Sequence, residues 1–471
     1  MDITRSSLQL FLANIGTAAL SFIGLTVFAR ALTPAQLGAF FLFEAIVSVA
    51  SLVTDFGLAS AVEKRISEGR YARDVLATGL VMKTVFVIVA SGAILLLRGP
   101  ISEYIGLNVA LLLVIALAFG ELGDLMEATL RGELRVGSTA AVTFSKQLLW
   151  VGAGTALIAV GIGEWALFYA LVIGLAVRAV FGVLRRSTPI GRPSRAYVSN
   201  LFDFGKYDLV NTVGWNVFNW MDILIIGWLS TQAAVGAYEV AWRVSMLTLL
   251  FSRALKFTVM PQVSAWDIEE APDRIEGLIR NLITPSLLFI IPSVFGVFLL
   301  GHRILDLVFG PEYAIAWLAL VILTGGKLVD GVVGLVDRCL SGIDRPDLSA
   351  RATAVTIGLN VGLNLVLIPS LGIVGAAVAT TTAYGVGGVI SVFYLSSFLT
   401  IQFPYWEVGW CVLAAVIMAL AIAGVQRAVV ITTIPRLIFV VLLGTAVYGI
   451  VILASGQLRG RILTNARNLL A

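Results

Sequence analysis

The chain has 471 residues, of which 59% are hydrophobic and only 13% charged, and its mean hydropathy is +0.97. Soluble domains carry about a quarter of their residues as charged groups, so this composition excludes an ordinary water-soluble protein and indicates a membrane protein. The formal net charge of +4 is explained by basic loops facing anionic lipid, and no nucleic-acid partner is expected.

Apolar segments of at least about 17 residues, the length needed to cross a bilayer, follow one another along the chain. They lack the alternating pattern of a barrel strand and therefore predict helices. Fourteen spans are expected, at residues 8–30, 35–57, 75–98, 109–130, 141–161, 165–184, 207–229, 234–255, 280–301, 315–337, 352–370, 375–398, 407–425 and 434–455. The first span is too long for a signal peptide and is expected to be retained.

Lys and Arg residues are unevenly divided between the loops. If the N-terminus is cytoplasmic, most of the 32 basic residues fall in inner segments, and Arg131, Arg135 and Lys146 share one inner loop. Because inner loops carry the excess of positive charge, the pattern predicts a multi-pass protein of the plasma membrane with both termini in the cytoplasm.

A weak internal repeat relates the two halves of the chain. The segment from Leu32 to Phe40 answers the segment from Leu229 to Tyr238, and three further pairs follow in the same order: Asn14 with Asn211, Gly120–Asp124 with Gly326–Asp330, and Gly161–Ile162 with Gly372–Ile373. Six helices per half leave both halves in the same orientation, so a parallel repeat with a cavity between two lobes is expected. The predicted divisions are 1–195 and 196–400 for the six-helix lobes and 401–471 for two extra helices and a cytoplasmic tail.

Ionisable and amide side chains inside the apolar spans are the candidate functional residues, since a charge in the bilayer centre costs about 2.5–3.5 kcal/mol even on the lenient scale. Glu44, Ser48, Ser51 and Asp55 recur at helical spacing and predict one polar stripe. The candidates for substrate binding and translocation are Asn14, Arg30, Glu44, Lys83, Asn211, Asn219, Asp222, Glu239 and Arg243, with Asp55, Glu121, Asp124, Lys327 and Asp330 as secondary polar or coupling candidates. Glu239 and Arg243 are one helical turn apart and are expected to pair.

A structural interpretation competes with the functional one for these residues. Hydroxyl and amide side chains commonly join helices through hydrogen bonds worth about 0.6 kcal/mol each, and this interpretation is favoured for the Ser, Thr and Asn members. Arg30 and Asp55 lie near span ends, where snorkelling towards water is an adequate explanation.

The signals of an enzyme are weak. His302 is the single histidine, and Cys339 and Cys411 lie in different segments without metal-ligand spacing. Gly325-Gly326-Lys327 is followed by Leu328 and fails the phosphate-loop pattern. No catalytic residue, metal or cofactor is therefore expected.

The segment Ile368-Pro369 to Gly372-Ile373-Val-Gly375-Ala-Ala-Val-Ala-Thr380, the segment from Ala29 to Phe40, and Asp55-Phe-Gly-Leu58 together carry a resemblance. They resemble the polysaccharide-export branch of the multidrug/oligosaccharidyl-lipid/polysaccharide exporter superfamily. The resemblance implies two six-helix lobes in a V shape, with the first, second, seventh and eighth spans lining a central cavity. It also implies transfer of a polyprenyl- or dolichyl-linked oligosaccharide from the cytoplasmic to the outer leaflet by alternating access.

With this resemblance, roles can be suggested for the candidate residues. Arg30, Lys83 and Arg243 would attract the phosphate of the lipid-linked oligosaccharide through charge-assisted contacts. Asn14, Asn211 and Asn219 would contact sugars. Glu44, Asp222 and Glu239 would balance charge or couple transport to H⁺ or Na⁺, and membrane lipids would surround the whole.

Other functions remain open. A multidrug or cation antiporter of the same superfamily shares the two-lobe plan but is expected to carry an acidic residue in its first helix, where this chain has Asn14 and hydroxyl groups. A flippase for a peptidoglycan precursor would differ only in its cargo. A membrane-embedded glycan polymerase or glycosyltransferase usually carries a large soluble loop, and the longest loop here, near residues 256–280, is a short amphipathic stretch.

Overall fold

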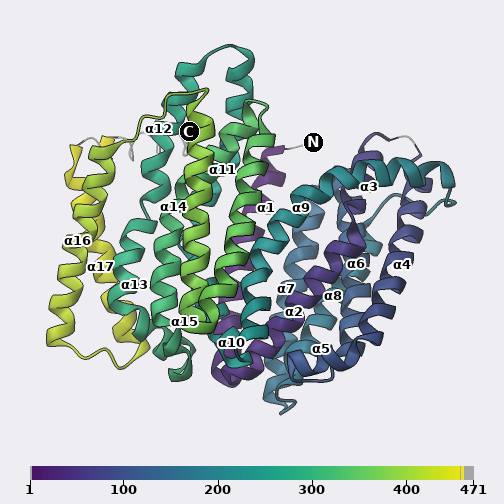
Figure 1. Ribbon diagram of the computed structural model, residues 1–471, viewed down its shortest axis with the longest axis horizontal. Helices are drawn as coiled ribbons and strands as arrows, with labels where there is room; N and C mark the ends of the chain where they lie inside the picture. The colour runs from purple at the N-terminus through teal and green to yellow at the C-terminus, as the bar shows by residue number, and fades with distance from the viewer. Residues whose placement is uncertain (1–2, 70, 457, 461–471) are drawn as a thin grey trace. The chain divides into compact units, whose positions relative to one another are not determined.

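The computed structural model describes residues 3–69, 71–456 and 458–460, and it describes the side chains of these residues apart from 3–15, 136, 205–218, 257 and 258. The described chain is helical throughout, without a strand among the described residues (Figure 1). It divides into two compact units, Met1–Gly236 and Ala237–Ala471, and each unit is described by itself. The predicted boundary between the two lobes, at residue 195, coincides with the first residue of a helix. The predicted lobe boundaries stay predictions.

The first unit contains nine helices before the one in which the division lies. These are α1 (Ile3–Ala31), α2 (Pro34–Asp55), α3 (Leu58–Ser67), α4 (Ala72–Leu96), α5 (Arg98–Ile105), α6 (Ala110–Gly132), α7 (Val136–Ala159), α8 (Trp165–Arg185) and α9 (Arg195–Leu229). α10 (Gln232–Leu247) contains the division. α9 packs along α2 and α3 and crosses them in Figure 1.

Sequence signals set the limits of α2. Thr33 accepts a hydrogen bond from the amide of Gln36, whose side chain in turn accepts one from the amide of Thr33, so the two form a capping box. Pro34 occupies the first helical turn, where no amide hydrogen is needed. The helix thus begins at a defined residue, which sets the phase of the polar stripe that follows.

Aromatic side chains hold α2 against its neighbours in the first unit. The Phe40 ring lies 6.0 Å from the Trp150 ring of α7 and 5.8 Å from the Phe168 ring of α8, measured between centroids. The Phe43 ring meets Phe168 edge-on at 5.1 Å. Such pairs add about 0.5–1.5 kcal/mol each beyond the area they bury, so the apolar half of α2 is firmly placed.

The second unit continues with α11 (Leu250–Ile268), α12 (Pro272–Leu287) and α13 (Ile290–Ile304), followed by the short turns η1 (Leu305–Phe309) and η2 (Pro311–Ala316). It ends with α14 (Trp317–Gly342), α15 (Pro346–Ser396), α16 (Tyr405–Ala428) and α17 (Ile434–Ala454). Its core gathers aliphatic side chains from α11 to α17, among them Ile290, Leu335 and Met418.

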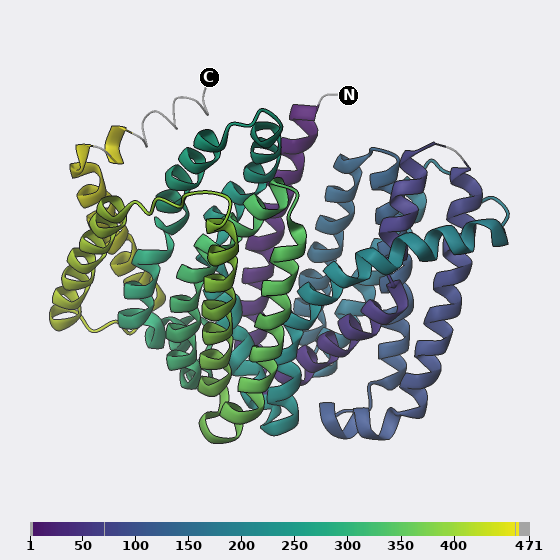
Figure 2. The ribbon, with the colours of Figure 1, turned by 45° about the horizontal axis from the view of Figure 1, so that its top comes forward.

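α15 is two helices joined at Gly372, not one straight rod (Figure 2). Gly372 adopts φ 57° and ψ −135°, a conformation that side chains disfavour. The side-chain amide (Nδ2) of Asn360 donates a hydrogen bond of 3.1 Å to the hydroxyl of Thr380, although 20 residues of straight helix would place them about 30 Å apart. The chain therefore reverses where the sequence predicts a turn between the spans 352–370 and 375–398.

Each of the fourteen predicted spans overlaps a helix, and the expected all-helical class is confirmed. By length and composition, eight helices within the described residues can each cross a membrane, or ten if each of two bent helix pairs is one span. One bent pair is α5 with α6, at 96°. The reversed α15 counts once among the eight, and the number of fourteen crossings stays a prediction.

Candidate functional site

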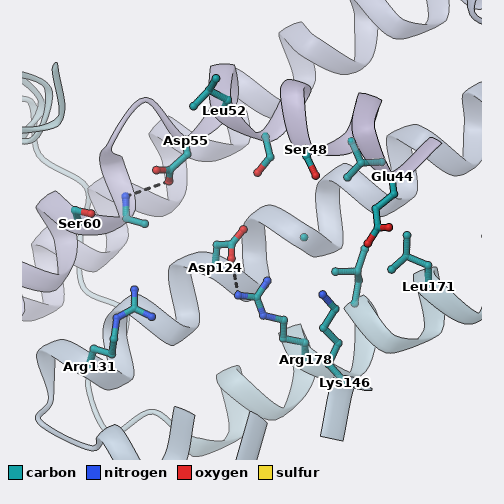
Figure 3. Close-up of a pocket in the computed structure, with 15 residues that line it drawn as sticks. Glu44, Ser48, Leu52, Asp55, Ser60, Asp124, Arg131, Lys146, Leu171 and Arg178 are labelled. Carbon is teal, nitrogen blue, oxygen red and sulfur yellow. Dashed lines mark hydrogen bonds and ion pairs between the residues drawn. The ribbon is translucent and has the colours of Figure 1, made fainter. Parts of the chain in front are cut away.

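A cavity of about 380 Å³ lies inside the first unit and is lined by charged and hydroxyl side chains (Figure 3). One wall is the polar stripe of α2, formed by Glu44, Ser48, Ser51 and Asp55. The side chains facing it are Asp124 and Arg131 of α6, Lys146 of α7, and Arg178 of α8, with Ala59 and Ser60 of α3 at one end. Leu171 and Leu175 of α8 complete the lining with apolar surface.

An ion network closes the α4 side of this region. The Lys83 ammonium lies 2.8 Å from the Asp55 carboxylate and is also paired with Glu121 of α6. The Ser51 hydroxyl donates a hydrogen bond to the same Glu121 carboxylate. Lys83 is only 3% exposed and Glu121 1%, so each charge depends on its partners, because an isolated buried charge would cost several kcal/mol.

A second network joins α6 and α8. The Arg178 guanidinium binds both Asp124 and Glu127, which lie about one turn apart on α6. Thr143 of α7 donates a hydrogen bond of 2.9 Å to Glu127. Asp124 and Arg178 line the cavity and are fixed there by these contacts, so they offer the cavity polar groups of defined position.

Lys146 differs from the other cations of the cavity. Arg178 is held by two carboxylates, and Arg131 lies 2.7 Å from Glu63 of α3. Lys146 makes no ion pair within 4.0 Å with any residue whose side chain the structure describes. It lies between Arg178 and Glu44 in the close-up (Figure 3), and so its ammonium is the cation best able to meet an anionic ligand.

The remaining candidates occupy separate places in the chain. Glu239 and Arg243 form the expected pair in α10, at 2.7 Å. Asp222 of α9 is buried, Asn219 half-buried, and Arg30 exposed in the last turn of α1. Asn14 and Asn211 lie outside the residues whose side chains the structure describes.

The two secondary candidates of the second unit are also engaged. Lys327 of α14 is buried, with its ammonium 3.9 Å from the centroid of the Trp242 ring, a cation–π contact. Asp330 of α14 lies 3.1 Å from the ammonium of Lys256 on α11. Neither lines the cavity of the first unit.

Comparisons with known proteins bear directly on this arrangement. Residues 27–317 match the model of the family described as "Polysaccharide biosynthesis protein", and residues 209–445 match that of "Lipid II flippase MurJ". The chain is 41% identical over 448 residues to the "Probable low-salt glycan biosynthesis flippase Agl15" of Haloferax volcanii, covering 95% of each chain. The chain belongs to the polysaccharide biosynthesis protein family. The resemblance carried by the Pro369 turn and the start of α2 is therefore confirmed.

The chain has further relatives in sequence and in fold. The "Probable flippase AglR" of Haloferax volcanii is 28% identical over 337 residues, 71% of each chain. A structure titled "Lipid II flippase MurJ, inward closed conformation" aligns with a TM-score of 0.82 at 16% identity, covering 94% of this chain and 98% of that one. An inward-facing multidrug resistance MATE family transporter aligns with a TM-score of 0.64 at 17% identity, covering 81% and 95%. At such identities the last two show a shared fold only.

Two residues that line the cavity, Lys146 and Arg178, are not among the candidates that the sequence indicates. The positive-inside count groups Lys146 with the inner-loop residues Arg131 and Arg135, although it lies five residues inside the predicted span 141–161. α7 begins at Val136, so Lys146 lies about three turns into the helix. Arg178 lies inside the predicted span 165–184, and an arginine in so apolar a helix was the signal that could have revealed it. The helices were identified, but the inward direction of these side chains was not.

Proposed function

We propose that this protein is a flippase that moves a lipid-linked oligosaccharide across the membrane by alternating access, acting as a transporter and not as an enzyme. The observation that carries the proposal is the cavity of the first unit, where Lys146, Arg178, Glu44 and Asp124 gather within a bundle of apolar helices. Such groups are expensive within a membrane and mark the paths of polar substrates. The family, one relative named as a probable glycan biosynthesis flippase and another named as a probable flippase support the same activity.

The chemistry of the cargo fits the lining of the cavity. Sugar hydroxyl groups can donate hydrogen bonds to carboxylates such as Glu44 and Asp55. They can also donate hydrogen bonds to, or accept them from, the hydroxyl groups of Ser48 and Ser51. A polar head group that loses water without such partners would meet a barrier of several kcal/mol. The lipid tail has no such need and can remain among acyl chains while the head group passes.

We assign the phosphate contact in this cavity to Lys146 in place of Lys83. Lys83 is fully engaged by Asp55 and Glu121, so contact with a ligand would require breaking a buried ion pair. The roles suggested for Arg30, Arg243, Asn219, Asp222 and Glu239 remain part of the proposal, as does coupling to H⁺ or Na⁺.

The orientation of the protein in the membrane is inferred from the distribution of basic residues. Exposed arginines such as Arg73, Arg192 and Arg195 lie in the segments predicted to face the cytoplasm. We propose that both termini lie on that side of the plasma membrane and that the oligosaccharide moves from the cytoplasmic to the outer leaflet. The lipid would be a polyprenyl or dolichyl carrier.

Transport by Lys146→Gln protein tests the proposal. The protein is reconstituted in liposomes with a fluorescent lipid-linked oligosaccharide, and the fraction that reaches the far leaflet is measured by capture with an external lectin. Loss of the phosphate contact is expected to reduce the rate about tenfold, as about 1.4 kcal/mol of lost stabilisation would do. Lys64→Gln, an exposed lysine of α3 outside the cavity, serves as the matched control. Equal rates for both variants would reject the assignment of Lys146, and no transport by the unmodified protein would reject the function.

A further inference from the structure

The segment between α8 and α9 is fastened to the start of α4. The amide of Gly191 donates to the carbonyl of Arg73 at 3.0 Å, the amide of Arg192 to the Asp74 carboxylate at 2.9 Å, and the amide of Ser194 to the hydroxyl of Thr78 at 3.0 Å. A Cβ atom on Gly191 would overlap the Asp74 carboxylate. The close approach therefore requires glycine at this position.

This contact creates a second cavity, of about 660 Å³, at the start of α4. It is lined by Gly69, Tyr71, Ala72, Arg73, Asp74, Ile190, Gly191 and Arg192. Arg73 comes from the first turn of α4 and Arg192 from the docked segment, so the backbone contacts bring two arginines to one cavity. The cavity shares no lining residue with the cavity around Lys146.

Neither arginine is occupied by a partner within the described part of the chain. The guanidinium groups of Arg73 and Arg192 make no hydrogen bond or ion pair with a described residue, and both side chains are exposed. Asp74 is the single carboxylate of the lining, and one of its oxygens accepts the Arg192 amide. Two positive charges against one negative charge leave the lining cationic.

The rim of this cavity is suited to the edge of a membrane. Tyr71 is 66% exposed and Ile190 47% exposed, and α4 is among the helices apolar enough to cross a bilayer. Tyrosine beside basic residues at the end of a membrane-spanning helix is typical of the head-group layer. An apolar rim around a cationic cavity matches a ligand that carries both a phosphate and a lipid body.

We propose that this cavity binds the phosphate of an anionic lipid head group, with Arg73 and Arg192 as its two cationic contacts. Guanidinium groups match phosphate oxygens in geometry as well as in charge. By binding both arginines at once, the lipid would hold the docked segment against α4. The proposal does not depend on glycan transport, because it concerns a different cavity.

Native mass spectrometry of the full-length protein in detergent tests the site. Phosphatidylglycerol is titrated against the protein, and phosphatidylcholine provides the comparison with no net charge. The Arg73→Gln/Arg192→Gln double variant is expected to bind phosphatidylglycerol with an affinity lower by at least about tenfold. The matched control is Arg98→Gln/Arg195→Gln, which removes the same charge from two exposed positions outside the cavity and is expected to bind as the unmodified protein does.

A third variant separates geometry from charge. Gly191→Ala keeps both arginines but displaces the docked segment, and it is expected to weaken phosphatidylglycerol binding while leaving the total charge unchanged. Equal binding by the two double variants, or full binding by Gly191→Ala, would overturn the site. Displacement of phosphatidylglycerol by about millimolar inorganic phosphate would show that the phosphate comes from solution and would overturn the lipid as its source.

Discussion

At the scale of single residues, two cations of the first unit, Lys83 and Arg178, are each stabilised by two carboxylates. Lys83 meets Asp55 and Glu121, and Arg178 meets Asp124 and Glu127. Replacing both members of such a pair by apolar groups can be neutral, but removing one member leaves an uncompensated charge. The stability of the unit therefore depends on complete networks more than on any one ion.

Lys83→Met is expected to destabilise the protein strongly, because Glu121 would remain buried without its cation. Loss of one partner of a buried pair costs about 3–5 kcal/mol in soluble proteins, so the unfolding temperature in detergent should fall clearly. The double variant Lys83→Met/Glu121→Gln should recover part of the loss. If the double variant were as unstable as the sum of the two single variants, the pair would not be coupled.

At the scale of elements, the course of α15 depends on one backbone conformation. Gly372 has a positive φ in the middle of 51 residues that are otherwise helical. The reversal allows two apolar arms to lie side by side, with Asn360 bonded to Thr380 between them. A side chain at residue 372 would oppose this reversal.

Gly372→Ala is therefore expected to lower stability by about 1–3 kcal/mol, the typical cost of a strained backbone conformation. Gly362→Ala is the control, since it lies in the first arm of the same element, without a positive φ and with open space around the added Cβ. Because alanine favours a helix over glycine, the control should unfold at the same or a higher temperature in detergent. Equal destabilisation by both substitutions would contradict the role of the turn.

At the scale of the whole molecule, the number and direction of the membrane crossings determine which residues are accessible from each side of the membrane. α8 lies between Val160, which is 79% exposed, and the exposed Arg195 at the start of α9. If α8 crosses the membrane once, these two positions lie on opposite sides. The positive-inside rule assigns Arg195 to the cytoplasm.

Single cysteines at these two positions measure the orientation. In a background with Cys339 and Cys411 replaced by alanine, a membrane-impermeant maleimide applied to intact cells should label Val160→Cys. It should label Arg195→Cys only after the membrane is opened. The native cysteines are both buried, so their replacement mainly removes background. The reverse labelling pattern would invert the proposed topology.

The sequence predicted the helices better than it predicted their partners. The stripe of Glu44, Ser48, Ser51 and Asp55 could be derived because helical spacing is a local property, and the four residues do line one cavity. The pairing of Lys83 with Glu121 could not, since these residues are 38 positions apart and spacing says nothing about which helices are neighbours. The predicted span 141–161 contains Lys146, but a lysine five residues from a span end can also snorkel to the loop, and spacing alone does not show that it points into a cavity.

The reversal at Gly372 has a consequence for the insertion of the protein into the membrane during its synthesis. The two arms of α15 are joined by a short turn, which leaves almost no hydrophilic chain on the far side of the membrane. The insertion machinery would then receive both arms together as a helical hairpin. After insertion, the loop of this hairpin would be too short for a protease to cleave or an antibody to bind.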